Sequence, residues 1–135
     1  MQNPGLQNPG PLVVRQSRLE YAETVDRLLG AITRRGLTVF ARIDHAAAAR
    51  QAGMELAAEE VVLLGNPRAG TPLMQRDRHV GIDLPLRILL WQENGGVFLG
   101  YKDPKELAGQ YDLADHKAAL DAMAVLLGEL VGETA

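Results

Sequence analysis

The sequence predicts one domain of the α+β class, built as a single mixed or antiparallel sheet of about five strands with two long helices. Its 135 residues, 47% of them hydrophobic and 23% charged, suffice to bury one sizeable core. Strand and helix patterns follow the order β-α-β-(α)-β-(α)-β-β-α, without the strict alternation of a doubly wound fold. An Asn-Gly pair between two strand patterns adds a hairpin, whose strands are antiparallel.

The chain begins with the segment MQNPGLQNPGP. Because Pro and Gly at this density disfavour helix and strand, we expect a flexible tail over residues 1–11. We expect the domain to span residues 12–131 and residues 132–135 to form a short second tail.

A strand at 12–16 and a long helix at 18–35 open the domain. Ser17 is the expected N-cap of this helix, and Glu20 completes a capping box. Apolar residues recur along the helix at three- and four-residue spacing, and Gly36 suits the position just beyond its last turn.

Alternating residues at 37–43 predict the second strand. Asp44 is the expected cap of a short helix at 45–51, which contains four consecutive alanines. An apolar run at 60–65 predicts the third strand.

After a loop at 66–70, we expect a short helix at 72–79, with Thr71 as its N-cap and Pro72 as its first residue.

Two further strands, at 86–92 and 97–102, flank Asn94-Gly95, the preferred pair for a two-residue hairpin turn. An amphipathic helix at 114–131 completes the domain. One layer of helices covers one face of such a sheet, and a partly apolar second face favours a homodimer.

Composition excludes several classes of function. The net charge of -3 argues against a general nucleic-acid binder, which needs a basic surface. No apolar stretch approaches the roughly 20 residues that span a bilayer, so we expect no membrane contact and a cytoplasmic location. The chain has no cysteine, so disulfides and thiolate chemistry are excluded. No nucleotide-binding or serine-hydrolase motif occurs, and we expect no cofactor.

Five segments together resemble a bacterial and archaeal family, domain of unknown function 302. They are TVFARIDH at 38–45, GNP at 65–67, GTPLM at 70–74, GIDLP at 81–85 and YKDP at 101–104. The resemblance implies an α+β fold and homodimers, and it implies no activity because the family has no established one. Many members carry Cys where this chain has Gly65, so thiol chemistry at that position is absent here.

The loop around Asn66 is the leading candidate for a binding site. Backbone N–H groups at the start of a helix hold anions, and Arg68 adds a cation beside Asn66 and Thr71. The alternative is a rigid turn followed by a helix cap, which equally explains Asn, Pro, Gly and Thr in this loop.

Other candidate residues lie on strands and at strand ends. Asp44 and His45 are adjacent and able to act as an acid–base pair, although Asp44 is also a natural helix cap. Trp91 and Lys102 lie on the two hairpin strands and line either a pocket or an ordinary packed sheet. The histidines lack metal-binding spacing, so we expect no metal site.

We therefore expect a dimeric binding module for a small anionic ligand. The alternatives are an acid–base enzyme acting on a small metabolite and a protein-interaction module that uses the exposed sheet face. No motif assigns catalytic residues, so the sequence leaves open whether the protein is an enzyme.

Overall fold

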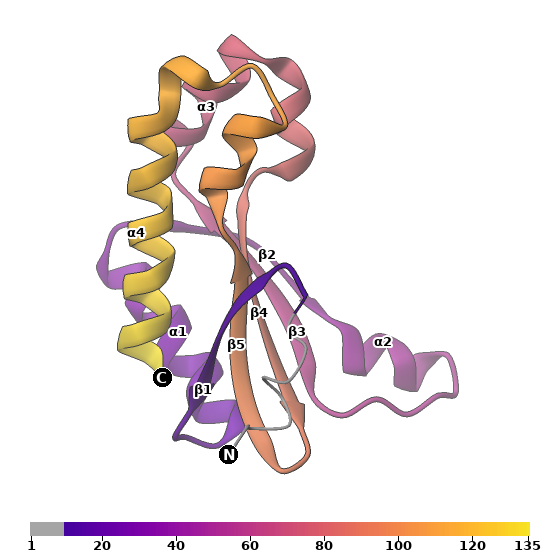
Figure 1. Ribbon diagram of the computed structural model, residues 1–135. Coiled ribbons are helices and arrows are strands. Elements are labelled where there is room, and N and C mark those ends of the chain that lie inside the picture. Colours follow the sequence, from indigo (N-terminus) through magenta and orange to yellow (C-terminus); the bar gives the residue numbers. More distant parts are fainter. Residues whose placement is uncertain (1–9) are drawn as a thin grey trace.

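An antiparallel sheet organises the chain, and the computed structural model describes residues 10–135 (Figure 1). The expected tail at 1–11 therefore lies almost wholly outside the described residues. The strands are β1 (Leu12–Ser17), β2 (Thr38–Asp44), β3 (Glu59–Gly65), β4 (Leu86–Glu93) and β5 (Gly96–Lys102). The α-helices are α1 (Tyr21–Arg34), α2 (His45–Gln51), α3 (Pro67–Arg76) and α4 (Lys117–Thr134). Short 3-10 helices are η2 (Arg78–Asp83), η3 (Pro104–Gly109) and η4 (Ala114–His116).

The five strands lie in the order β1-β5-β4-β3-β2, and every neighbouring pair is antiparallel. The α+β prediction with one sheet of five strands is therefore confirmed. The register between β2 and β3 shifts between Val39 and Ala41, so Phe40 has no direct partner on β3. By this register, β1, β2 and β4 begin and β3 and β5 finish at the same end of the sheet, and the candidate cavities lie at that end.

The beginning of α1 differs from the prediction. Ser17 is the last residue of β1, and its hydroxyl bonds the Thr24 hydroxyl at 2.8 Å instead of capping the helix. Glu20 is the N-cap residue, with no side-chain cap hydrogen bond. The expected capping box fails because the strand continues one residue further than the apolar run indicates.

Gly36 ends α1 as expected. Its φ of +70° lies in the left-handed region, and its N–H donates to the Thr33 carbonyl at 3.0 Å. The Leu37 N–H donates to the Ile32 carbonyl at 3.2 Å. These two bonds form a Schellman motif and direct the chain into β2.

The last helix is displaced relative to the prediction. Residues Ala114–His116 form η4, and α4 continues to Thr134, which is buried. Residues 132–134, expected as a tail, therefore belong to α4. The helix packs beside α1, where Arg35 forms ion pairs with Glu129 and Glu133.

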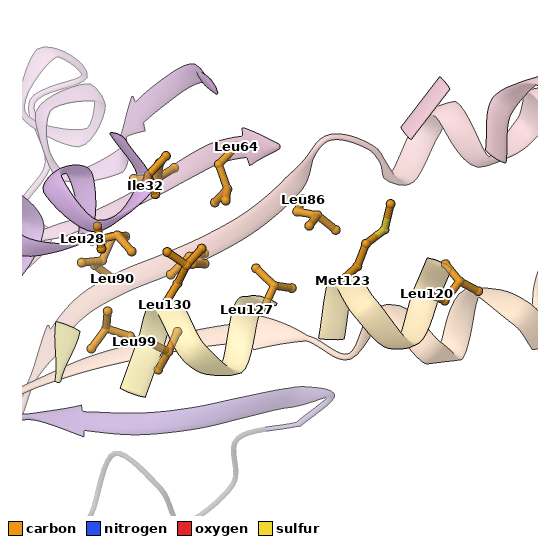
Figure 2. Packing of buried hydrophobic residues seen from close by; sticks show 14 of the residues in the cluster. Leu28, Ile32, Leu64, Leu86, Leu90, Leu99, Leu120, Met123, Leu127 and Leu130 are labelled. Carbon is orange, nitrogen blue, oxygen red and sulfur yellow. The ribbon is translucent and has the colours of Figure 1, made fainter. Parts of the chain in front are cut away.

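The core lies between one face of the sheet and helices α1 and α4. Figure 2 shows leucines of β3, β4 and β5 turned toward leucines of both helices. The fully buried large side chains of the core include Leu28, Ile32, Leu64, Ile88, Leu90, Leu99, Leu127 and Leu130. Burial of each such side chain stabilises the fold by roughly 1.5–3 kcal/mol relative to exposure.

The hairpin between β4 and β5 is confirmed. Asn94 and Gly95 have φ values of 51° and 81°, as a two-residue type I′ turn requires. The strands begin and end within one residue of the predicted bounds.

The second face of the sheet carries no α-helix within residues 10–135 (Figure 1). Side chains alternate along a strand, so the neighbours of the core leucines point to this face. We call this surface the open face. Phe98 stacks on Trp91 there, and the other apolar residues of this face are Leu12, Val14, Ala41, Ile43, Val61, Leu63, Leu89 and Trp91. These other residues are half-buried or exposed.

Candidate functional site

Two cavities lie at the end of the sheet where β3 and β5 finish and β4 begins. The first, here called the apolar cavity, has a volume of about 400 Å³. It lies between α3, α4 and the adjoining ends of β2, β3 and β4. Its apolar lining consists of Leu37, Phe40, Leu64, Met74, Leu84, Pro85, Leu86, Met123 and Leu126. Figure 2 shows Leu86 and Met123 facing each other from β4 and α4.

Polar residues of the apolar cavity come from the start of α3. Asn66 and Thr71 line it, together with Ala69 and Gly70. Asn66 is the true N-cap of α3: its Oδ1 accepts the Arg68 N–H at 2.9 Å. Thr71, expected as the cap, instead lies inside the helix. The prediction failed because Asn66-Pro67 supplies a second cap and first-residue pair, five residues earlier.

The cap occupies the N–H groups of the first turn of α3. Besides the Arg68 N–H, the N–H groups of Ala69 and Gly70 both donate to the Asn66 carbonyl, at 2.9 and 3.1 Å. Pro67 has no N–H. The polar groups of the lining that remain for a ligand are the Asn66 side-chain amide N–H₂ and the Thr71 hydroxyl. Arg68 is exposed and follows Asn66 and Pro67 without lining the cavity itself.

Gly65 also lines the apolar cavity. A Cβ added at this position would lie 3.9 Å from the Phe40 ring, an ordinary van der Waals distance. A side chain at position 65 would therefore enter the cavity. Position 65 thus belongs to the wall of this site.

The second cavity, here called the charged cavity, has a volume of about 340 Å³. Lys102 lines it, and so do Asp83, Arg87, Asp103 and Glu106. The Tyr111 hydroxyl donates to Asp83 Oδ2 at 2.6 Å, and this bond raises the pKa of the phenol. The Arg87 guanidinium donates to the Ile82 carbonyl at 2.9 Å.

Trp91 lines neither cavity. Its ring stacks on Phe98 of the paired strand, with centroids 5.6 Å apart. A Cβ on Gly100 would lie only 3.1 Å from the indole, so the ring covers this glycine closely. Tyr101, on the paired strand, points to the opposite face, where a Cβ on Gly128 of α4 would lie 3.5 Å from its hydroxyl.

Asp44 and His45 lie at the opposite end of the sheet from both cavities. Asp44 caps α2 by accepting the Ala47 N–H at 2.8 Å, as expected for a helix cap. His45 is exposed. The structure therefore brings neither residue to Asn66 or Lys102.

Near Asp44 lies a buried carboxylate. Glu60 is 5% exposed and forms a bidentate ion pair with Arg42, at 2.9 and 3.0 Å. Burial, followed by the charge of Glu60, raises the pKa of the Tyr21 phenol. Within residues 10–135, no three His, Asp or Glu side chains are grouped to hold a metal ion.

Of the residues singled out from sequence, Asn66 and Thr71 line the apolar cavity and Lys102 lines the charged cavity, and most other lining residues were not singled out. Phe40 could have been recognised from the sequence, because its aromatic side chain alternates with the apolar residues of its strand, at a position where a polar residue is expected. Arg87 could not, since an Arg within a strand also fits a solvated surface.

Comparisons with known proteins place these features in a family. A crystal structure of an uncharacterised conserved DUF302 protein from Bacillus stearothermophilus matches with a TM-score of 0.84 and 18% identity. It covers 93% of this chain and 98% of that chain, so the likeness shows the fold.

Curated relatives occur in Brucella. A protein of Brucella suis biovar 1 (strain 1330) named fluoride-specific ion channel FluC 1 is 43% identical over 103 residues, which are 76% of this chain and 41% of that protein. A protein of Brucella abortus biovar 1 (strain 9-941) with the same name is 43% identical over the same length, 38% of its own. The chain spans about two-fifths of these relatives.

No helix within residues 10–135 combines the length and apolar character needed to cross a bilayer. Residues 13–130 match the family model described as "Domain of unknown function DUF302". The chain therefore belongs to the DUF302 family.

Proposed function

We propose that this chain acts in the cytoplasm as a dimeric binding module for a small ligand with an apolar body and an anionic head. The observation that carries the proposal is the apolar cavity of about 400 Å³ beside Asn66. Ligand sites in proteins are commonly concave, mostly apolar and roughly 300–1,000 Å³ in volume, with a few polar groups that orient the ligand. The apolar cavity has each of these properties.

The apolar lining favours a hydrocarbon body, and the volume of the cavity limits it to about four to eight carbons. Each CH₂ that is buried there contributes about 0.8 kcal/mol to binding. The polar groups lie on one side, at the start of α3. The Asn66 amide and the Thr71 hydroxyl each offer a hydrogen-bond donor, and Arg68 offers a charge that pairs with a carboxylate or phosphate. The positive end of the α3 dipole favours the same charge.

A thermal-shift series tests the proposal. We expect straight-chain carboxylates of about four to eight carbons to raise the melting temperature more than the alcohols of equal length, because only carboxylates pair with Arg68. A ligand at 100 times its Kd stabilises the native state by about 2.7 kcal/mol.

Two variants locate the site. Ala69→Leu adds a side chain at the cavity wall, and we expect it to weaken carboxylate binding at least about tenfold by calorimetry, a change of about 1.4 kcal/mol. Ala122→Leu, on an exposed position of α4 outside the cavity, is the matched control and should leave binding unchanged. Equal binding by Ala69→Leu and the parent chain would place the ligand elsewhere, and no shift with any carboxylate would refute the proposal.

The open face supports the dimeric part of the proposal. Apolar residues of all five strands lie on it, and a contiguous apolar surface of this kind marks an interaction site. A second copy of the chain provides a matching apolar surface, since symmetric dimers use the same patch on both subunits.

A further inference from the structure

The charged cavity lies where β4 and β5 separate. Their pairing runs from the hairpin turn to Leu89 and Gly100 and goes no further. On either side, β4 stays paired with β3 as far as Leu86, and β5 stays paired with β1 as far as Lys102. A gap therefore opens inside the sheet between β4 and β5.

Main-chain polar groups face this gap. In a two-residue hairpin the pair next to the turn is hydrogen-bonded, and every second pair repeats the arrangement. Glu93 with Gly96 is the first such pair, and Leu89 with Gly100 is the last. The next would be Arg87 with Lys102, whose N–H and C=O groups therefore point toward the gap beyond the end of the ladder.

Charges of both signs surround the gap, and they are segregated. Arg87 and Lys102 come from the separating strands, and both side chains are on exposed residues. The carboxylates come from the 3-10 helices and the cap of one of them: Asp83 ends η2, Asp103 caps η3 directly after Lys102, and Glu106 lies in η3. Cations thus border the cavity along the strands, and carboxylates border it along η2, η3 and the η3 cap.

The apolar lining of the cavity comes from both faces of the sheet. Val61 and Leu89 line it from the open face, and Leu107 and Leu127 line it from η3 and α4. A ligand that complements the cations, the carboxylates and the apolar residues carries an anionic group, a cationic group and a small apolar group in one compact molecule.

We propose that the charged cavity binds a small zwitterion of the class of α-amino acids with apolar side chains. The carboxylate lies against Arg87 and Lys102, the ammonium group lies against Asp83 and Glu106, and the side chain lies on Leu89 and its apolar neighbours. This site is separate from the apolar cavity and goes beyond the proposed function.

Isothermal titration of the Ala69→Leu variant, in which carboxylate binding beside Asn66 is weakened, with three matched compounds tests the zwitterion. L-Leucine carries both charges, 4-methylpentanoate lacks the ammonium group, and 3-methylbutylamine lacks the carboxylate. We expect L-leucine to bind at least about tenfold more tightly than either analogue, because each analogue leaves one set of charges unpaired. Equal binding of L-leucine and 4-methylpentanoate would overturn the zwitterion, and no saturable binding of L-leucine would overturn the site.

Variants connect the binding to the cavity. Lys102→Met and Glu106→Gln each remove one charge from an exposed residue, and both should weaken L-leucine binding at least about fivefold while the circular dichroism spectrum stays unchanged. Lys117→Met, on an exposed residue outside the cavity, is the control and should bind as the parent chain does. If Lys102→Met also binds as the parent chain does, the site lies elsewhere. Ala69→Leu should leave L-leucine binding intact, which separates this site from the carboxylate site beside Asn66.

Discussion

The ion pair between Arg42 and Glu60 joins a buried carboxylate to a partly exposed guanidinium. The Glu60 side chain is 6% exposed and the Arg42 side chain 47%. A buried charge that loses its partner is strongly destabilising, although the pair itself adds little over a hydrophobic replacement. The pair therefore matters because Glu60 is already buried on the helix side of the sheet.

We expect Arg42→Met to lower the free energy of unfolding by about 1–3 kcal/mol, less than for a fully buried pair because water reaches Arg42. The double variant Arg42→Met with Glu60→Met should recover most of this loss, because no unpaired charge remains. Urea denaturation measures both. Arg34→Met removes an exposed partner of Glu133 and should cost at most about 1 kcal/mol. Equal losses for Arg42→Met and Arg34→Met would contradict the role given to burial.

At the scale of elements, α3 and α1 place glycine in two different conformations. Gly70 is the fourth residue of α3, and a Cβ there would lie 3.7 Å from Leu84 Cδ1, an ordinary contact. Gly36 follows α1 with a φ of +70°, which L residues rarely adopt. The two positions therefore respond in opposite ways to the same substitution.

We expect Gly70→Ala to stabilise the fold by about 0.5–1 kcal/mol, because alanine favours helix and restricts the unfolded chain. Gly36→Ala should destabilise the fold by roughly 1–2 kcal/mol, because its Cβ disfavours the left-handed conformation. Thermal denaturation of the two variants under identical conditions measures the difference. A loss of stability in Gly70→Ala would show that the Leu84 contact is tighter than its distance indicates.

Local chemistry explains which elements were predictable. Asn94-Gly95 and Gly36 occupy conformations that few other residues adopt, so the hairpin and the end of α1 followed from sequence. The start of α3 did not, because Asn66-Pro67 and Thr71-Pro72 are equally good caps by type. The separation of β4 from β5 depends on contacts with β1, β3 and η3, and no local pattern records such contacts.

The same distinction applies to the candidate site. Asn66 was found because its residue type is informative, and its neighbours Phe40 and Met123 were missed because they come from distant segments. Asp44 and Lys102 were both named as candidates because of their residue types, and the fold places them at opposite ends of the sheet.

At the scale of the whole molecule, the open face is the largest surface that the helices leave uncovered. Its central residues, Val61, Leu63 and Leu89, lie on adjacent strands, and Ile43 lies near its edge with 45% of its surface exposed. Symmetric association would bury this surface on both copies and remove its apolar area from water. Charged residues at the same positions would oppose that burial without disturbing the core, which lies on the other side of the sheet.

We expect the parent chain to be a dimer by light scattering at about 50 μM, since dimers with interfaces of about 1,600 Å² commonly form at such concentrations. Ile43→Lys and Leu63→Lys should each shift the mass toward the monomer, because a lysine at either position leaves a charge buried without a partner. Val125→Lys, on a residue of α4 that is 60% exposed, is the control and should remain dimeric. A monomeric parent chain would refute the dimer, whereas dissociation by Val125→Lys alone would move the interface to α4. Loss of the dimer in the two open-face variants and in neither of the other chains would assign the open face to a second copy.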